Sequence, residues 1–88
     1  MNIEKKAIQD AIVDILCAKI YLPAELCAQK YWDLALTGDH FRLSAVDLAY
    51  FFFEVEKRYH IHIEEEYLLS YEFNSVNSIA EIIKKYVP

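Results

Sequence analysis

The sequence predicts one all-α domain over residues 1–88, with three main helices, one short helix and a long loop between helices one and two. Three observations carry this prediction. The chain has 88 residues, of which 56% are hydrophobic and 15% aromatic, so it can build one core and is too apolar for a disordered segment. It contains one Gly and two Pro, too few for the many turns of an all-β domain. Its apolar residues recur at helical spacing in the segments described next.

The first main helix is predicted over residues 3–18, where apolar residues form one face: Ile8, Ala11, Ile12, Ile15 and Leu16. It ends before Pro23, because the residue that precedes a proline is pushed out of the α region. A long connection follows over residues 20–43. Pro23 is expected to open a short helix through residue 30, and Gly38 marks a turn. Four apolar residues should pin the connection onto the bundle: Trp32, Leu34, Leu36 and Phe41.

The second main helix is predicted over residues 45–59. Ser44 is a favourable N-cap, and Asp47 stands three residues later, which predicts a capping box with Asp in place of the usual Glu. The helical period places one set of residues on the core face: Leu48, Phe52, Val55 and Tyr59. The opposite side is marked by charged residues: Asp47, Glu54 and Arg58.

The remaining elements are an extended connector and two helices. Ile61 and Ile63 are expected to point inward from the connector. Glu64-Glu65-Glu66 places acid in the first turn of a short helix over residues 65–71, where the helix dipole favours it. Asn74 and Ser75 offer caps for a last helix over residues 76–86. Lys84 and Lys85 stand at its C-terminal end.

Charge and composition exclude several classes of partner. Nine Lys and Arg against fourteen Asp and Glu give a net charge of −5, the reverse of a nucleic-acid binder, and also disfavour an anionic membrane. No run approaches the ~20 apolar residues of a membrane span, and no apolar signal region follows the opening residues. We therefore expect a cytoplasmic protein with reduced thiols at Cys17 and Cys27. Cys17 is predicted in the core, and the placement of Cys27 is left open.

Neither catalysis nor a metal site has support in the sequence. His60 and His62 precede the glutamate run, but their spacing matches no usual zinc pattern, and a solvated pair is favoured. The glutamates lack the spacing and the glycine of a calcium loop. A single Gly cannot make a phosphate-binding loop, and nothing local marks either cysteine as a nucleophile. We expect a protein that is not an enzyme.

The order of helices, and the pattern inside it, resembles the acyl carrier and peptidyl carrier proteins. The second helix of that family typically begins Asp-Ser-Leu-Asp and ends Glu-Glu-Phe, followed by Gly-Ile-Glu-Ile. Here the ending reads Glu56-Lys57-Arg58-Tyr59-His60-Ile61-His62-Ile63. The opening of the family's last helix corresponds to Ser75-Val76-Asn77-Ser78-Ile79. The resemblance implies an acyl-carrier-like four-helix bundle with a long loop between helices one and two.

The resemblance also locates the place where carriers hold 4′-phosphopantetheine, and here the sequence departs from the family. Counting back without gaps from Tyr59, Asp-Ser-Leu-Asp falls on Ser44-Ala45-Val46-Asp47. The attachment position is Ala45, which has no hydroxyl. Ser44 lies one residue away and is the alternative attachment site. A role as N-cap is the favoured interpretation of Ser44, so no cofactor is the first expectation.

The second helix is the recognition surface of carriers, and the resemblance carries that role to six positions: Asp47, Tyr50, Phe53, Glu54, Glu56 and Lys57. The four rings of residues 50–53 are consecutive, so at least one must face away from the core. Two interpretations stay open: the long connection covers that ring with Trp32 or Phe41, or the ring docks a partner.

A subgroup of carrier-like proteins is especially similar, namely those that accompany the maturation of bacteriocin-type peptides in bacteria. The similarity lies in Leu36-Thr37-Gly38, in the aromatic second helix and in the missing serine. It implies a non-enzymatic adaptor or carrier that works with peptide-modifying or acyl-transferring enzymes. Two alternatives remain: a true carrier modified at Ser44, and a helical domain that self-associates through its aromatic helix. We expect a monomer or weak self-association.

Overall fold

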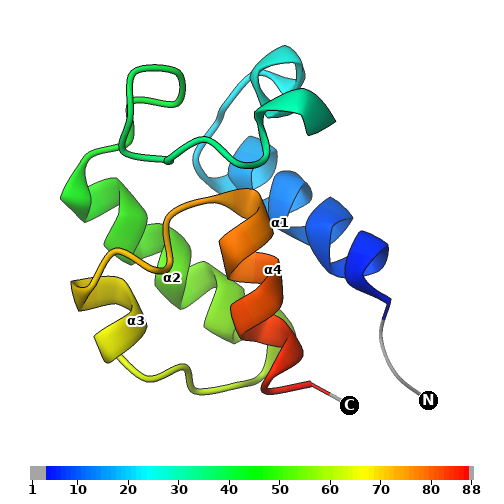
Figure 1. The fold of residues 1–88 in the computed structure, drawn as a ribbon, viewed down its shortest axis with the longest axis vertical. Helices are drawn as coiled ribbons and strands as arrows, with labels where there is room; N and C mark the ends of the chain where they lie inside the picture. The colour runs from blue at the N-terminus through cyan, green and yellow to red at the C-terminus, as the bar shows by residue number, and fades with distance from the viewer. Residues whose placement is uncertain (1–3, 88) are drawn as a thin grey trace.

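The computed structural model describes residues 4–87, and every regular element in that range is helical (Figure 1). The all-α class and the order of the helices are confirmed. The predicted start of the first helix at residue 3 lies outside the described residues. The elements are α1 (Lys5–Lys19), α2 (Ala45–Tyr59), α3 (Glu66–Leu69) and α4 (Val76–Lys84), with two 3₁₀ turns, η1 (Ala24–Cys27) and η2 (Gln29–Tyr31), between α1 and α2.

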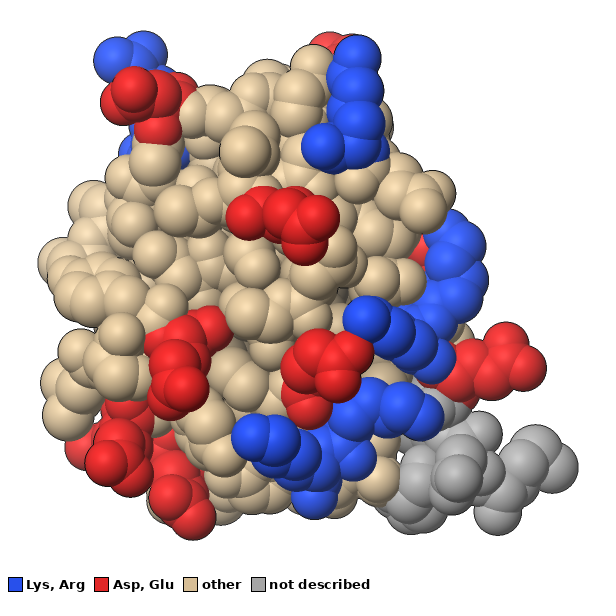
Figure 2. All heavy atoms as spheres, in the orientation of Figure 1, with Lys and Arg blue, Asp and Glu red and all other residues tan. Residues whose placement is uncertain are grey.

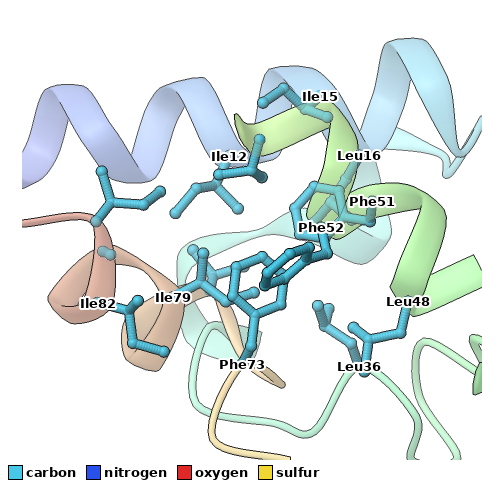
Figure 3. Packing of buried hydrophobic residues seen from close by; sticks show 14 of the residues in the cluster. Ile12, Ile15, Leu16, Leu36, Leu48, Phe51, Phe52, Phe73, Ile79 and Ile82 are labelled. Carbon is cyan, nitrogen blue, oxygen red and sulfur yellow. The ribbon is translucent and has the colours of Figure 1, made fainter. Parts of the chain in front are cut away.

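One apolar core joins α1, α2 and α4 with the long connection. Helix α1 packs on both α2 and α4. Phe73, in the segment between α3 and α4, is fully buried, and its ring centroid lies 5.0 Å from that of Phe52 and 5.8 Å from that of Phe51. Figure 3 shows side chains from these elements converging on the same interior: Ile12 and Leu16 of α1, Phe51 and Phe52 of α2, and Ile79 of α4.

The connection between α1 and α2 is anchored as predicted, with one exception. Trp32, Leu36 and Phe41 are buried in the core. Leu34 is 42% exposed, so its predicted anchoring is wrong. The reason is a turn closed by the Leu34 amide, which donates to the Tyr31 carbonyl at 3.0 Å and leaves Leu34 on the outside before Leu36 turns inward.

The short helix predicted after Pro23 is two separate 3₁₀ turns instead. Ala28 has extended backbone angles and separates η1 from η2, while Pro23 precedes η1 rather than opening it. Two further contacts fix the segment: His40 stacks on Tyr31 with 3.9 Å between ring centroids, and the indole of Trp32 donates to the Cys27 carbonyl at 2.8 Å. Short 3₁₀ pieces are common in such connectors.

The cysteine predicted in the core is only half-buried, and the cysteine whose placement was left open is in the core. Cys27 is buried, whereas Cys17 is half-buried and packs against the edge of the core. Helix α1 turns Ile12 and Leu16 to the centre, so position 17 falls on the flank of the helix. Cys17 is therefore less buried than predicted.

The second half of the chain follows the predicted order with shorter helices. Ile63 is buried as expected, while Ile61 is half-buried. Helix α3 has one turn, and α4 begins at its predicted residue but ends at Lys84. Ser75 caps α4, accepting from the Ser78 amide at 3.0 Å. Within residues 4–87, no helix has the length and apolar character needed to cross a bilayer.

Candidate docking surface on the second helix

Helix α2 begins with the predicted capping box. The Ser44 hydroxyl oxygen accepts a hydrogen bond from the Asp47 amide at 3.0 Å, and Asp47 Oδ2 accepts one from the Ser44 amide at 3.1 Å. These two bonds satisfy amide groups that a helix start would otherwise leave unpaired. Ser44 and Ala45 are both exposed. Ala45 therefore presents a methyl group to solvent, beside a Ser44 hydroxyl that serves as a cap.

The four consecutive rings of α2 divide between core and surface. Phe51 and Phe52 are buried, whereas Tyr50 is 46% and Phe53 59% exposed. Val46, one turn before Tyr50, is 78% exposed. Val46, Tyr50 and Phe53 follow the spacing i, i+4, i+7, so they form one stripe opposite the core face. The connection does not cover this stripe, because Trp32 and Phe41, its expected covering residues, are themselves in the core.

A separate hollow lies between the start of α2 and the α3 segment. Its volume is about 200 Å³, and its lining is apolar apart from one phenol: Ala45, Leu48, Leu68, Leu69 and Tyr71. Leu69 is 75% and Tyr71 56% exposed. Figure 2 shows an uncharged area at the left of the view, near the start of α2 in Figure 1, with acidic groups below it around α3. We call the combined set the α2–α3 apolar surface: Ala45, Val46, Tyr50, Phe53, Leu69 and Tyr71.

Two of the six predicted partner-binding residues do not face solvent. Glu54 is only 8% exposed, which contradicts its placement on the open side of α2. The side chain turns toward α1, beside Ile15 and Lys19, and its Oε1 lies 3.4 Å from Lys57 Nζ. Because α1 crosses that flank of α2, a position that the helical period marks as polar is covered.

Glu56 is held in the structure rather than presented to a partner. One of its carboxylate oxygens accepts a hydrogen bond from the Ile63 amide at 2.8 Å and lies 3.3 Å from His62 Nδ1. The side chain of Glu56 is 13% exposed. It ties the end of α2 to the connector that follows. The other predicted members, Asp47, Tyr50, Phe53 and Lys57, are exposed.

The environment of Tyr50 changes the pKa of its phenol. Partial desolvation, and then the charge of the neighbouring Glu54 carboxylate, raise the pKa of Tyr50 above its usual value. Tyr21 is 83% exposed and holds a left-handed backbone, with φ of 64°, where α1 gives way to the connection.

Several residues of the α2–α3 apolar surface were not predicted from the sequence. Val46 was detectable, because it shares the i, i+4, i+7 spacing of Tyr50 and Phe53 on the face opposite the core. Leu69 and Tyr71 carried no such signal. A one-turn helix is too short for its sequence to show which apolar residues face outward. The exposure of Leu69 and Tyr71 depends on how α3 packs against α2.

The rest of the described chain gives weaker evidence of a functional site than α2 does. Among residues 4–87, no group of three or more His, Cys, Asp and Glu side chains converges as metal ligands. Another hollow, of about 530 Å³, is lined by residues of α4, of the segment from α3 to α4 and of the connection, and by none of α2. Its charged groups already have partners: Glu81 pairs with Lys5 at 2.7 Å, and Lys85 donates to the Tyr67 hydroxyl at 3.3 Å. No protein-family model, curated protein or solved structure matches this chain.

Proposed function

We propose that the chain is an acyl-carrier-like, non-enzymatic adaptor that docks on peptide-modifying or acyl-transferring enzymes through α2. One observation carries the proposal: a stripe of exposed apolar side chains, Val46, Tyr50 and Phe53, runs along a helix whose opposite face fills the core. Single exposed apolar residues are ordinary, but clustered aromatic ones are typical of interfaces. The stripe lies on the helix that carriers use for recognition.

The start of α2 supports an adaptor without a prosthetic group. At the position aligned with the family's serine, Ala45 has no oxygen to form a phosphodiester. The Ser44 oxygen is engaged with the Asp47 amide, and moving it would forfeit about 1 kcal/mol of capping. The carrier scaffold is therefore retained for recognition, and 4′-phosphopantetheine at Ser44 is the second candidate, favoured by the exposure of that hydroxyl beside the apolar hollow.

The charges around the apolar surface indicate the kind of partner. The chain carries a net charge of −5, and Asp47 is exposed beside the stripe. Figure 2 shows acidic groups gathered at the lower left, where Figure 1 places α3. An enzyme surface with an apolar centre and a basic rim is complementary to this arrangement. Opposite charges at the rim raise the rate of association, while the apolar centre supplies most of the affinity.

The test is the affinity of the whole chain for enzymes encoded next to it, measured by calorimetry. Phe53→Asn removes the most exposed ring of α2 and is expected to weaken binding by tenfold or more, on the order of a central interface residue. Leu34→Asn is the matched control, because it removes a comparably exposed apolar side chain from the connection. Equal losses in the two variants would refute docking through α2.

Two further measurements separate the alternatives. Intact mass after co-expression with a broad phosphopantetheinyl transferase shows whether Ser44 is modified. Ser44→Asn is the matching variant, because Asn caps a helix as well as Ser but has no hydroxyl. A mass gain of one phosphopantetheinyl group that disappears in this variant would replace the adaptor by a carrier. Light scattering addresses self-association: a dimer that Phe53→Asn dissociates would assign the stripe to a second copy of the chain.

A further inference from the structure

The Leu36-Thr37-Gly38 turn of the long connection is bonded to Asn74, in the segment between α3 and α4. The Leu36 amide donates to the Asn74 backbone carbonyl at 2.7 Å. The Asn74 side chain makes two further bonds: its Oδ1 accepts from the Thr37 amide at 3.2 Å, and its Nδ2 donates to the Thr37 hydroxyl oxygen at 3.0 Å. We call these three bonds the Asn74 clasp. They join segments that lie 37 residues apart in the sequence.

The Asn74 clasp is connected to both walls of the hollow between α2 and the α3 segment. On one side, the Leu43 amide donates to the Leu36 carbonyl at 2.9 Å, directly before Ser44 caps α2. On the other side, Asn74 stands three residues after Tyr71, which lines the hollow. The same turn is therefore bonded to the residue that precedes the cap of α2 and to the segment that follows α3.

The position of α3 depends on contacts outside the helix, because its single turn offers little surface for packing. The backbone of α1 approaches α2 and α4 closely, whereas the backbone of α3 approaches no helix to the same extent. Tyr71, which follows α3, has a left-handed backbone with φ of 62°. A bulky residue keeps such a backbone only where its surroundings hold it. The buried ring of Phe73 and the Asn74 clasp hold the chain directly after Tyr71.

We infer that Asn74 is a positioning residue for the α2–α3 apolar surface, because its clasp fixes Leu69 and Tyr71 relative to the start of α2. The consequence for binding rests on the proposed function, whereas the positioning of Tyr71 does not depend on a partner. With the clasp closed, Tyr71 keeps its left-handed backbone and the hollow keeps its volume of about 200 Å³. When the clasp is broken, Tyr71 returns to an ordinary backbone and its ring leaves the wall of the hollow.

The test compares Asn74→Leu with Asn77→Leu in the whole chain. Asn77 is the matched control, because it is half-buried like Asn74 and lines no part of this hollow. Its Nδ2 donates to Asp33 at 2.6 Å, and its Oδ1 accepts from Gln9 at 2.7 Å. Each variant therefore loses two side-chain hydrogen bonds, and both should lower the urea midpoint of unfolding by similar amounts.

The first measurement is the NMR spectrum of the residues that line the hollow, recorded without any partner. Asn74→Leu should shift the ring signals of Tyr71 and the methyl signals of the apolar lining: Ala45, Leu48, Leu68 and Leu69. Asn77→Leu should leave these signals in place. Signals that Asn74→Leu leaves unchanged, or that both variants shift equally, would overturn the positioning role. If Asn74→Leu does not fold, Thr37→Val takes its place, because it removes only the hydroxyl acceptor of the clasp.

The second measurement is the affinity for an enzyme that docks on α2, determined by calorimetry. Asn74→Leu should weaken binding roughly two- to tenfold, the factor by which one neutral hydrogen bond shifts a two-state equilibrium, and Asn77→Leu should not. Unchanged affinity of Asn74→Leu, while Phe53→Asn still weakens binding, would overturn the link between the clasp and docking. If Phe53→Asn has no effect, docking through α2 is refuted, and the NMR comparison still decides the positioning role.

Discussion

Removing the cap at the start of α2 is the sharpest test of how Ser44 is used. In Ser44→Ala, the Asp47 amide loses the acceptor that now lies at 3.0 Å, while the bond from the residue-44 amide to Asp47 Oδ2 remains. Replacing an N-cap serine by alanine costs about 1 kcal/mol, within a range of about 0.5–2. For a chain of this length, that loss lowers the melting temperature by roughly 4–8 °C.

The assay is urea unfolding followed by circular dichroism, with Ser44→Asn as the control. Asparagine retains the cap, so its free energy of unfolding should stay close to that of the original chain. A double-mutant cycle with Asp47→Ala should show that the two losses are not additive, because the capping box acts as a unit. If Ser44→Ala changes the free energy of unfolding no more than Ser44→Asn does, the hydroxyl is not a structural cap. A role of the Ser44 hydroxyl other than capping would then explain the serine better.

Three other substitutions test the core, a buried acceptor and a surface ion pair. Phe73→Ala empties the centre of the aromatic cluster and should cost about 3–5 kcal/mol in urea unfolding, a large share of the stability of a small domain. Glu56→Ala leaves the Ile63 amide without its acceptor and should cost about 1–3 kcal/mol, whereas Glu56→Gln keeps an acceptor oxygen and should cost less. The hydrogen bond from Lys5 lowers the pKa of Glu81, so Lys5→Met should raise that pKa in an NMR titration. Because the pKa of Glu81 is lowered in the folded protein, the ion pair contributes to the free energy of unfolding above the ordinary carboxyl pKa. That contribution is lost as the pH falls through the lowered pKa. A Glu81 titration unchanged by Lys5→Met would contradict this pairing.

Most of the fold could be predicted because local signals agreed with the packing. Helix α2 begins and ends at its predicted residues, since Ser44 caps its start and His60 adopts a left-handed backbone at its end. The predictions that were wrong concern residues whose burial is set by contacts between helices. Glu54 is a charged residue, and charged residues default to solvent. Its burial follows from the path of α1 across α2, which no spacing within α2 contains.

The candidate site was predictable in part for the same reason. The run of four rings required an exposed ring, and the structure selects Tyr50 and Phe53. The hollow beside Ala45 was not predictable, because its wall comes from α3, whose single turn has too few residues to define a face.

The alignment that puts Ala45 at the attachment position can be tested by restoring the missing motif. Ser44→Asp, Ala45→Ser and Val46→Leu together recreate Asp-Ser-Leu-Asp at the start of α2. The changes are mild, because Asp is as good an N-cap as Ser and all three residues are exposed. If the start of α2 retains the geometry of a carrier, a broad phosphopantetheinyl transferase should modify this variant. Intact mass should then show one added phosphopantetheinyl group, attached to the hydroxyl that Ala45→Ser introduces. A folded variant that stays unmodified would show that the likeness to carriers does not extend to this surface, and the stripe of Val46, Tyr50 and Phe53 would then have to be explained without it.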